Sequence, residues 1–220
     1  MDTYRTEEEQ IDAIKKWWSK NGINTVLTIV VVSALVVGWR GWQSRQLDNE
    51  AEASALYQNL FEVHQQLEQQ ANEENAATAD HLTTQLKENF ESSAYARYAA
   101  LFKAKRDAEK GEFSDAESEL NWALARTEGG VLTPEDLPLR DLLQLRIAKV
   151  LLAQKKLDEA EAALAKIASP EFQILAMELE GDISLARGNI EEARESYQQA
   201  LDSLGASGAA EILRIKIDNL

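Results

Sequence analysis

The chain has 220 residues, of which 23 are Lys or Arg and 38 are Asp or Glu, giving a formal net charge of −15. This acidity argues against nucleic acid as a partner, because binding a phosphate backbone requires a basic protein surface. The sequence contains no Cys, which excludes disulfides, thiol nucleophiles and cysteine-ligated metal centres. Its hydrophobic fraction of 45% is too high for a wholly disordered chain.

The charge is distributed unevenly along the chain. Residues 1–45 carry 6 Lys+Arg and 5 Asp+Glu, whereas residues 46–220 carry 17 and 33, a net charge of −16. From Asn21 to Trp39 there are 19 consecutive uncharged residues, rich in Val, Ile, Leu and Ala. As a helix, this run spans about 28 Å, close to the thickness of the hydrocarbon core of a bilayer. We therefore predict a transmembrane helix at residues 21–42.

Tryptophan residues flank this apolar run on both sides. Four of the five Trp in the chain are predicted to be membrane-interface anchors, as in the aromatic belts of transmembrane helices: Trp17, Trp18, Trp39 and Trp42. A buried core helix is the first alternative, although such a helix is usually shorter or carries a polar stripe. A cleaved signal peptide is the second, but no small-x-small cleavage site precedes Trp39. Whether the small-residue pair Ala34 and Gly38 packs on a partner helix stays open.

The basic residues that flank the run indicate its orientation. Four lie on the N-terminal side and two on the C-terminal side: Arg5, Lys15, Lys16 and Lys20, against Arg40 and Arg45. Because positively charged flanks stay in the cytoplasm, we expect residues 1–20 to be cytoplasmic and residues 43–220 to lie on the other side. The run would then be an uncleaved signal anchor. Residues 7–20 fit either an interfacial amphipathic helix or a frayed tail.

The remainder of the chain is predicted to be a helical repeat. From Gln46 onward the strong helix formers Ala, Leu, Glu, Gln and Lys dominate, and strand signatures are absent. Residues 104–124, 148–168 and 181–201 share one register of small, turn, small and large apolar positions. These positions hold Ala104, Ala148 and Gly181; then Gly111, Lys155 and Gly188; then Ala116, Ala160 and Ala193; and last Leu120, Leu164 and Tyr197.

This register matches the tetratricopeptide pattern of a helix, a tight turn and a second helix. The fold class is therefore predicted to be all-α, with a single N-terminal transmembrane helix followed by a tetratricopeptide-like (TPR) solenoid. An irregular helical bundle is the alternative. Residues 71–79 are predicted to be a polar turn or linker, and residues 208–220 a capping helix. Ser114-x-x-Glu117 and Asp158-x-x-Glu161 are interpreted as capping boxes of second helices.

Catalytic motifs are missing from the sequence. Neither His64 nor His81 has a second metal ligand at the i+3 or i+4 position, so a zinc site is not supported. No glycine-rich phosphate loop and no nucleophile elbow occurs. The acidic residues alternate with Lys and Arg along helix faces, as on solvated helical surfaces. We therefore expect a non-catalytic protein that has no cofactor, no metal and no small-molecule substrate.

Repeat solenoids bind partners through the concave face that their first helices line. The repeat register predicts a partner-binding groove formed by Tyr98, Leu101, Lys105, Leu145, Lys149, Leu152, Glu178 and Asp182. The apolar members are equally well explained as core between repeats, and the polar members as ordinary surface. Both interpretations stay open.

Four features in this order resemble the YfgM family of bacterial ancillary SecYEG translocon subunits. They are the N-terminal segment EEEQIDAIKKWWSKNG, a span that ends in GWRGW, the repeats, and the C-terminal RIKIDNL. The resemblance implies a single-pass inner-membrane protein with a cytoplasmic N-terminus and a periplasmic TPR-like domain. It also implies association with the SecYEG translocon and the periplasmic chaperone PpiD, and assistance to newly translocated proteins. No catalytic motif carries over.

Two functions fit these features best, and an enzyme is a distant third. The first is a membrane-anchored interaction protein beside the translocon that holds a chaperone or an unfolded, emerging client chain. The second is an anchored scaffold for another envelope complex, such as cell-wall assembly or stress signalling. Stoichiometry and affinity stay open.

Overall fold

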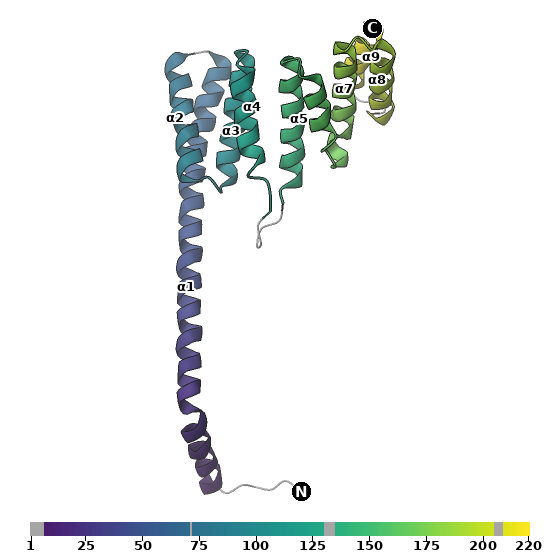
Figure 1. Cartoon of the computed structure of the whole chain (residues 1–220). Helices are drawn as coiled ribbons and strands as arrows, with labels where there is room; N and C mark the ends of the chain where they lie inside the picture. The colour runs from purple at the N-terminus through teal and green to yellow at the C-terminus, as the bar shows by residue number, and fades with distance from the viewer. Residues whose placement is uncertain (1–6, 71, 130–134, 205–208) are drawn as a thin grey trace. The chain divides into compact units, whose positions relative to one another are not determined.

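The computed structural model describes residues 7–70, 72–129, 135–204 and 209–220. In these ranges the chain forms nine α-helices and no strand, which confirms the predicted all-α class (Figure 1). The chain divides into two compact units, Met1–Glu52 and Ala53–Leu220. We call the second unit the repeat domain.

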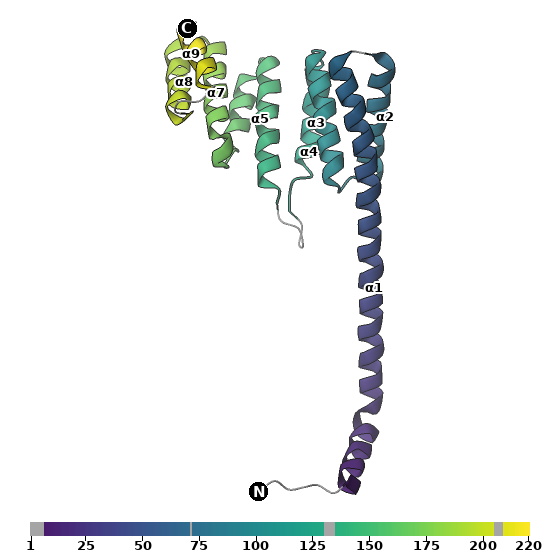
Figure 2. The same ribbon diagram turned by 180° about the vertical axis from the view of Figure 1, so that it is seen from behind.

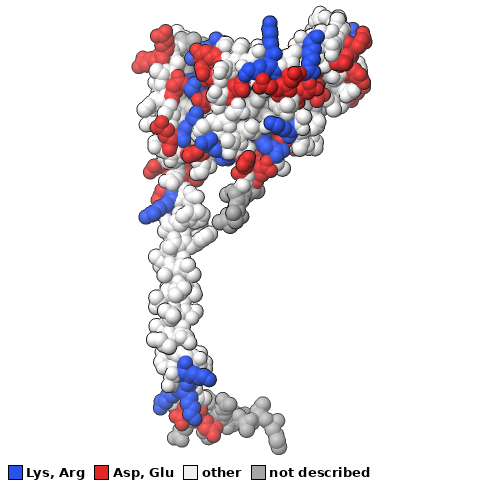
Figure 3. Space-filling model, in the orientation of Figure 1, with Lys and Arg blue, Asp and Glu red and all other residues white. Residues whose placement is uncertain are grey.

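Helix α1 (Glu7–Gln69) begins in the first unit and ends in the repeat domain. Its most apolar 18-residue window has a mean hydropathy of 2.0 and is only 6% buried. Apolar side chains in this window face outward, with Val30 and Leu35 57% and 68% exposed, so the window does not belong to a core in the described chain. Figure 3 shows it as a stretch of helix without charged side chains. Within the described ranges, α1 alone is long and apolar enough to cross a membrane.

The segment before the apolar run is helical, because residues 7–20 belong to α1. A frayed tail is therefore not observed from Glu7 onward. The indole of Trp18 lies over Gly22, where an added Cβ would come within 3.1 Å of the ring. Trp17 and Trp18 have ring centroids 6.3 Å apart, and those of Trp39 and Trp42 are 5.2 Å apart. Each flank of the run thus presents a pair of half-exposed indoles.

The repeat domain consists of helices that follow one another in antiparallel pairs (Figures 1 and 2). The C-terminal part of α1 leads into α2 (Glu73–Asn89), α3 (Ala94–Glu109), α4 (Phe113–Leu124), α5 (Leu137–Ala153), α6 (Leu157–Leu164), α7 (Pro170–Ala186), α8 (Ile190–Leu204) and α9 (Ala209–Asp218). The core comprises three groups of apolar side chains. One joins α1, α2 and α3, the largest runs from α3 to α7, and the third joins α7, α8 and α9.

The predicted repeat register is confirmed by burial and by backbone conformation. The small and large register residues are all buried, and Ala116, Ala160 and Ala193 are completely so. The three predicted turn positions are the described residues with positive φ: Gly111 at 81°, Lys155 at 61° and Gly188 at 84°. Left-handed backbone favours glycine, because a Cβ is strained there. Lys155 occupies this conformation with a side chain.

The last repeat differs from the other two at its first small position and at its large apolar position. The other repeats have Ala and Leu there, whereas the last repeat has Gly181 and Tyr197. A Cβ added at Gly181 would lie 2.4 Å from Cε1 of Tyr197, whose side chain is 1% exposed. The tyrosine ring therefore fills the space that the missing side chain leaves. In the preceding repeat the same two register positions hold Ala148 and Leu164.

A buried carboxylate connects α5 to the beginning of α7. Asp141 is 0% exposed, and its Oδ2 accepts hydrogen bonds from the backbone N–H groups of Ala168 (3.0 Å) and Ser169 (2.7 Å). Arg140 forms an ion pair with its other oxygen at 3.1 Å. Although burial opposes ionisation, these hydrogen bonds outweigh it and lower the pKa of Asp141. Asp141 thus satisfies the donors at the start of α7, where Ser169 makes no side-chain cap.

Two local predictions are wrong. Glu73 to Ala79 form the first turns of α2 and not a linker, because Asn72 caps this helix by accepting a hydrogen bond from the backbone N–H of Glu74 at 2.8 Å. Ala71 lies outside the described residues. The capping boxes are also absent. Helix α4 begins at Phe113 and α6 at Leu157, so Ser114 and Asp158 lie inside the first turn, and neither helix has a side-chain cap.

Candidate interaction groove

Two adjoining hollows on the repeat domain form one surface, which we call the groove. The first has a volume of about 360 Å³ and is lined by Tyr57, Phe61, His64, Glu68, Tyr98, Leu101, Phe102, Lys105 and Arg146. The second, of about 300 Å³, is lined by Leu101, Ala104, Lys105, Ala108, Glu109, Leu120, Arg146, Lys149 and Val150. They share Leu101, Lys105 and Arg146, so a ligand can run across both. Apart from Leu120 of α4, these residues come from α1, α3 and α5, the first helices of their pairs.

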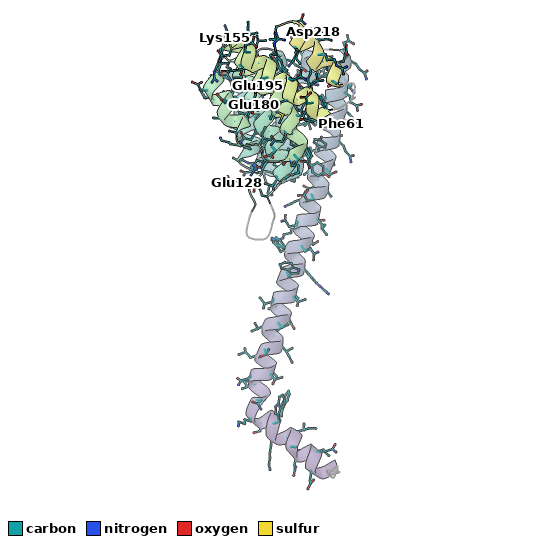
Figure 4. The ribbon with its side chains drawn as sticks, turned by 90° about the vertical axis from the view of Figure 1, so that its right-hand side faces the viewer. Phe61, Glu128, Lys155, Glu180, Glu195 and Asp218 are labelled. Carbon is teal, nitrogen blue, oxygen red and sulfur yellow. The ribbon has the colours of Figure 1, made fainter. Side chains whose placement is uncertain are left out.

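Aromatic rings form the floor of the first hollow. Phe102 of α3 is stacked on Tyr57 of α1, with centroids 5.8 Å apart and planes 8° apart. It also contacts Phe61 at 6.2 Å and His64 at 4.3 Å between ring centroids. Phe61, labelled on α1 in Figure 4, remains 43% exposed, and Tyr98 is 39% exposed. The floor is thus built from rings that hold one another while two of them still face solvent.

His64 is the buried member of this floor. Its residue is 7% exposed, its Nε2 lies 3.4 Å from a carboxylate oxygen of Glu68, and its Nδ1 has no hydrogen-bond partner. Burial lowers the pKa of His64, and Glu68 opposes this shift only in part. The imidazole is therefore neutral near pH 7 and contributes an uncharged ring to the floor.

Basic side chains line the rim of the groove. Lys105 forms ion pairs with Glu68 and Glu109, and the hydrogen bond that its ammonium donates to the Glu68 carboxylate is the largest cause of its raised pKa. Arg146 and Lys149 lie one turn apart on α5 and are exposed. Neither forms an ion pair or a side-chain hydrogen bond with another described residue. Two cations of the rim are thus available to a ligand.

The structure brings together half of the residues that the sequence predicted for a groove: Tyr98, Leu101, Lys105 and Lys149. Leu145 is instead 3% exposed and belongs to the largest core group, and Leu152 packs against that group. For these two, the alternative of core between repeats holds. Glu178 and Asp182 lie outside the groove. They contact side chains of α8 and α9 instead.

Glu178 and Asp182 of α7 belong to a closed polar cluster. Lys216 of α9 donates to Asp182 Oδ1 at 2.6 Å and pairs with Glu178 at 2.7 Å, and the Tyr197 hydroxyl donates to the same Asp182 oxygen at 2.7 Å. Burial acts against the charge on Lys216, but the two carboxylates raise its pKa above the usual value. Burial and the Asp182 carboxylate also raise the pKa of Tyr197. These groups satisfy one another and hold α9 against α7 and α8.

Other residues of the groove were not predicted from the sequence, among them Tyr57, Phe61, His64 and Arg146. The first three occur at i, i+4 and i+7 in α1, a spacing that places them on one helical face. That spacing is a signal available in the sequence, although the same helix also carries a leucine-rich face, formed by Leu56, Leu60, Val63 and Leu67, that packs in the core. Arg146 directly follows Leu145, which was predicted to line the groove. Only its position around helix α5 shows that Arg146 faces the groove while Leu145 faces the core.

Comparison with known proteins identifies the family of the chain. Residues 15–220 match the family model described as a tetratricopeptide repeat-like domain. The chain is 33% identical over 216 residues to the ancillary SecYEG translocon subunit of Haemophilus influenzae, covering 97% of both proteins. The chain belongs to this family. The identically named proteins of Escherichia coli and Neisseria gonorrhoeae are 26% and 29% identical, with 99% and 100% of their lengths covered.

Another hollow of the described surface is rich in glutamate. A hollow of about 380 Å³ between α6, α7 and α8 gathers Glu161, Glu180, Glu192 and Glu195, of which Glu180 and Glu195 are labelled in Figure 4. Burial, together with Glu161, raises the pKa of Glu180. Among the described residues, no group of three or more His, Cys, Asp or Glu is arranged to hold a metal ion. The groove combines exposed aromatic rings with cations that have no ionic partner among the described residues, and we take it as the candidate site.

Proposed function

We propose that this chain is a single-pass inner-membrane protein that acts as an ancillary subunit of the SecYEG translocon. Residues 1–20 lie in the cytoplasm, residues 21–42 span the membrane, and residues 43–220 form a periplasmic domain. In this function the groove holds a protein partner, the chaperone PpiD or a newly translocated chain, and the protein catalyses no reaction.

The likeness to ancillary SecYEG translocon subunits over almost the entire length carries this proposal. This likeness covers both the apolar run and the repeats. It therefore supports the same order of parts, an apolar helix followed by a repeat domain. Two observations agree with it. The apolar part of α1 is exposed and flanked by indoles, as expected for a helix in lipid. The groove combines an exposed aromatic floor with cations that have no ionic partner in the described parts of the chain, features that suit recognition of another chain.

The proposed orientation is testable because the chain has no Cys. We would introduce Ser19→Cys before the span or Ser114→Cys in α4, which is exposed, and treat spheroplasts with a membrane-impermeant maleimide. Ser114→Cys should react in intact spheroplasts and Ser19→Cys only after permeabilisation. The reverse pattern would contradict the cytoplasmic N-terminus.

The partners are tested by mild-detergent co-purification of the full chain from its native membrane. We expect translocon subunits and a membrane-anchored periplasmic chaperone. A photo-crosslinker at Tyr98 or Lys149 should trap one of them directly, whereas a crosslinker at Lys155, which is exposed outside the groove, should not. Recovery of only cell-wall enzymes or signalling proteins would instead support an anchored scaffold for another envelope complex, the second function.

A further inference from the structure

We propose that the groove recognises an acidic segment of a protein partner, with an apolar side chain of that segment on the aromatic floor and its carboxylates on Arg146 and Lys149. This inference rests on the proposed function only in taking the repeat domain to hold a protein partner. The charges, the exposed rings and the contrast with the rest of the domain support it in turn.

The charge of the groove runs against that of the domain. Residues 46–220 carry a net charge of −16, yet the groove is lined by three cations and two carboxylates. Both carboxylates, Glu68 and Glu109, are already paired with Lys105. Arg146 and Lys149 are left to face the solvent together on one helical face. Because opposite charges steer encounters and fix register, this pair favours a partner segment that carries carboxylates.

The aromatic floor specifies the second half of the recognition. Among the described residues of the repeat domain, Phe61 and Tyr98 are the large exposed aromatics, and both line the groove. Tyr98 contacts the ring of Tyr57 and Phe61 contacts the ring of Phe102, both in tilted geometry, so little side-chain freedom is lost on binding. An exposed ring pair held in this way is suited to bury an apolar side chain.

The opposite end of the domain would repel the same segment. The hollow between α6, α7 and α8 presents four glutamates and one arginine, and that arginine, Arg187, already pairs with Asp158 and Glu161. An acidic chain is thus attracted to α5 and repelled from α8. This difference gives the bound segment a defined location.

The test uses the full chain in non-ionic detergent and a short fluorescein-labelled peptide that repeats Glu-Leu-Phe-Glu, with its Lys-for-Glu counterpart as the probe of charge. Fluorescence anisotropy should show binding of the acidic peptide only. The double substitution Arg146→Glu/Lys149→Glu should weaken it by about tenfold, since exposed charge pairs contribute modestly and salt screens them. The control Lys155→Glu/Lys166→Glu makes the same charge change at exposed lysines outside the groove and should bind as wild type.

A second pair of variants separates the apolar contribution. Phe61→Ala should weaken binding of the acidic peptide, whereas Leu185→Ala, which trims a similarly exposed apolar side chain outside the groove, should not. Equal binding of both peptides, or equal loss in the control lysine variant, would overturn the inference.

The outcomes also separate this inference from the proposed function. If translocon subunits co-purify equally with wild type and Arg146→Glu/Lys149→Glu, and the acidic peptide does not bind, the inference fails and the proposed function stands. If the peptide binds but no translocon subunit is recovered, the proposed function fails and the inference stands. A dimer that this double substitution dissociates in light scattering would make a second copy of the chain the occupant, and would overturn the inference.

Discussion

The groove and the C-terminal end of the repeat domain use charged and aromatic residues in opposite ways. At the C-terminal end, Lys216, Asp182, Glu178 and Tyr197 satisfy one another across α7, α8 and α9. At the groove, Arg146 and Lys149 have no ionic partner among the described residues, and Phe61 and Tyr98 stay exposed. The closed end shows how this chain pairs its polar groups when it stabilises itself. The open cations of the groove are therefore available for something outside the chain.

The largest expected effect concerns the buried carboxylate of Asp141, which connects α5 to the start of α7. Asp141→Asn should lower the free energy of unfolding by about 2–3 kcal/mol at pH 7, because charge-assisted hydrogen bonds to the start of α7 are lost. The pKa of Asp141 is lowered in the folded state from a usual value of 3.8. Its contribution is thus full above that pH and is lost as the pH falls through the lowered value.

Urea unfolding of the full chain in mild detergent, followed by circular dichroism, measures this difference. The stability gap between wild type and Asp141→Asn should narrow below about pH 4. A gap that is unchanged at acidic pH would mean that the asparagine perturbs packing and not charge.

The second prediction concerns the packing of the closed end. Gly181→Ala should destabilise the chain by about 1–2 kcal/mol, because the clash with the buried Tyr197 ring exceeds the gain in helix propensity. Adding Tyr197→Leu restores the Ala and Leu combination of the preceding repeat and should recover part of this loss. The thermal midpoints of the single and double variants measure the coupling, and strictly additive effects would contradict it.

The third prediction opens the polar cluster. Lys216→Met removes the cation shared by Glu178 and Asp182 and should cost about 1 kcal/mol, because the site is only partly buried. In contrast, Arg146→Met in the groove should leave stability unchanged to within about 0.5 kcal/mol. Equal losses for the two variants in urea unfolding would remove the distinction between a closed and an open end.

The smallest effect is expected at a turn. Lys155→Gly should stabilise the chain by about 0.5–1 kcal/mol, since the strain of a left-handed non-glycine residue outweighs the entropy that glycine adds to the unfolded state. The matched change Lys166→Gly, at an exposed residue without positive φ, should not stabilise. A loss of stability in Lys155→Gly would show that the lysine side chain makes a contribution of its own.

The fold was largely predictable because the repeat register depends on residue size and on backbone conformation. Small residues such as Ala116 and the left-handed turn at Gly111 are visible in the sequence as spacings. Helix starts were less predictable. The N-terminus of α4 follows from the turn at Gly111, so the Ser114 pattern carried no capping information.

The site was only half predictable, because membership of a groove depends on neighbours that are remote in sequence. Leu145 and Lys149 both fit the first-helix face, yet the first is core and the second is rim. Glu178 and Asp182 had the expected phase, but Lys216, more than thirty residues later, pairs with them. The aromatic residues at the end of α1 were missed because the same helix also carries core residues such as Leu60, and only the packing of α3 shows which side chains stay open.

The continuity of α1 has a consequence for limited proteolysis. Ala53 and Leu60, buried residues of the first core group, belong to the same helix as the apolar run. Cleavage between residues 43 and 52 would therefore release a fragment that retains every core group, whereas cleavage beyond Leu60 would strip the floor of the groove. A protease that trims α1 progressively should pass from a stable fragment to a rapidly degraded one within about three helical turns.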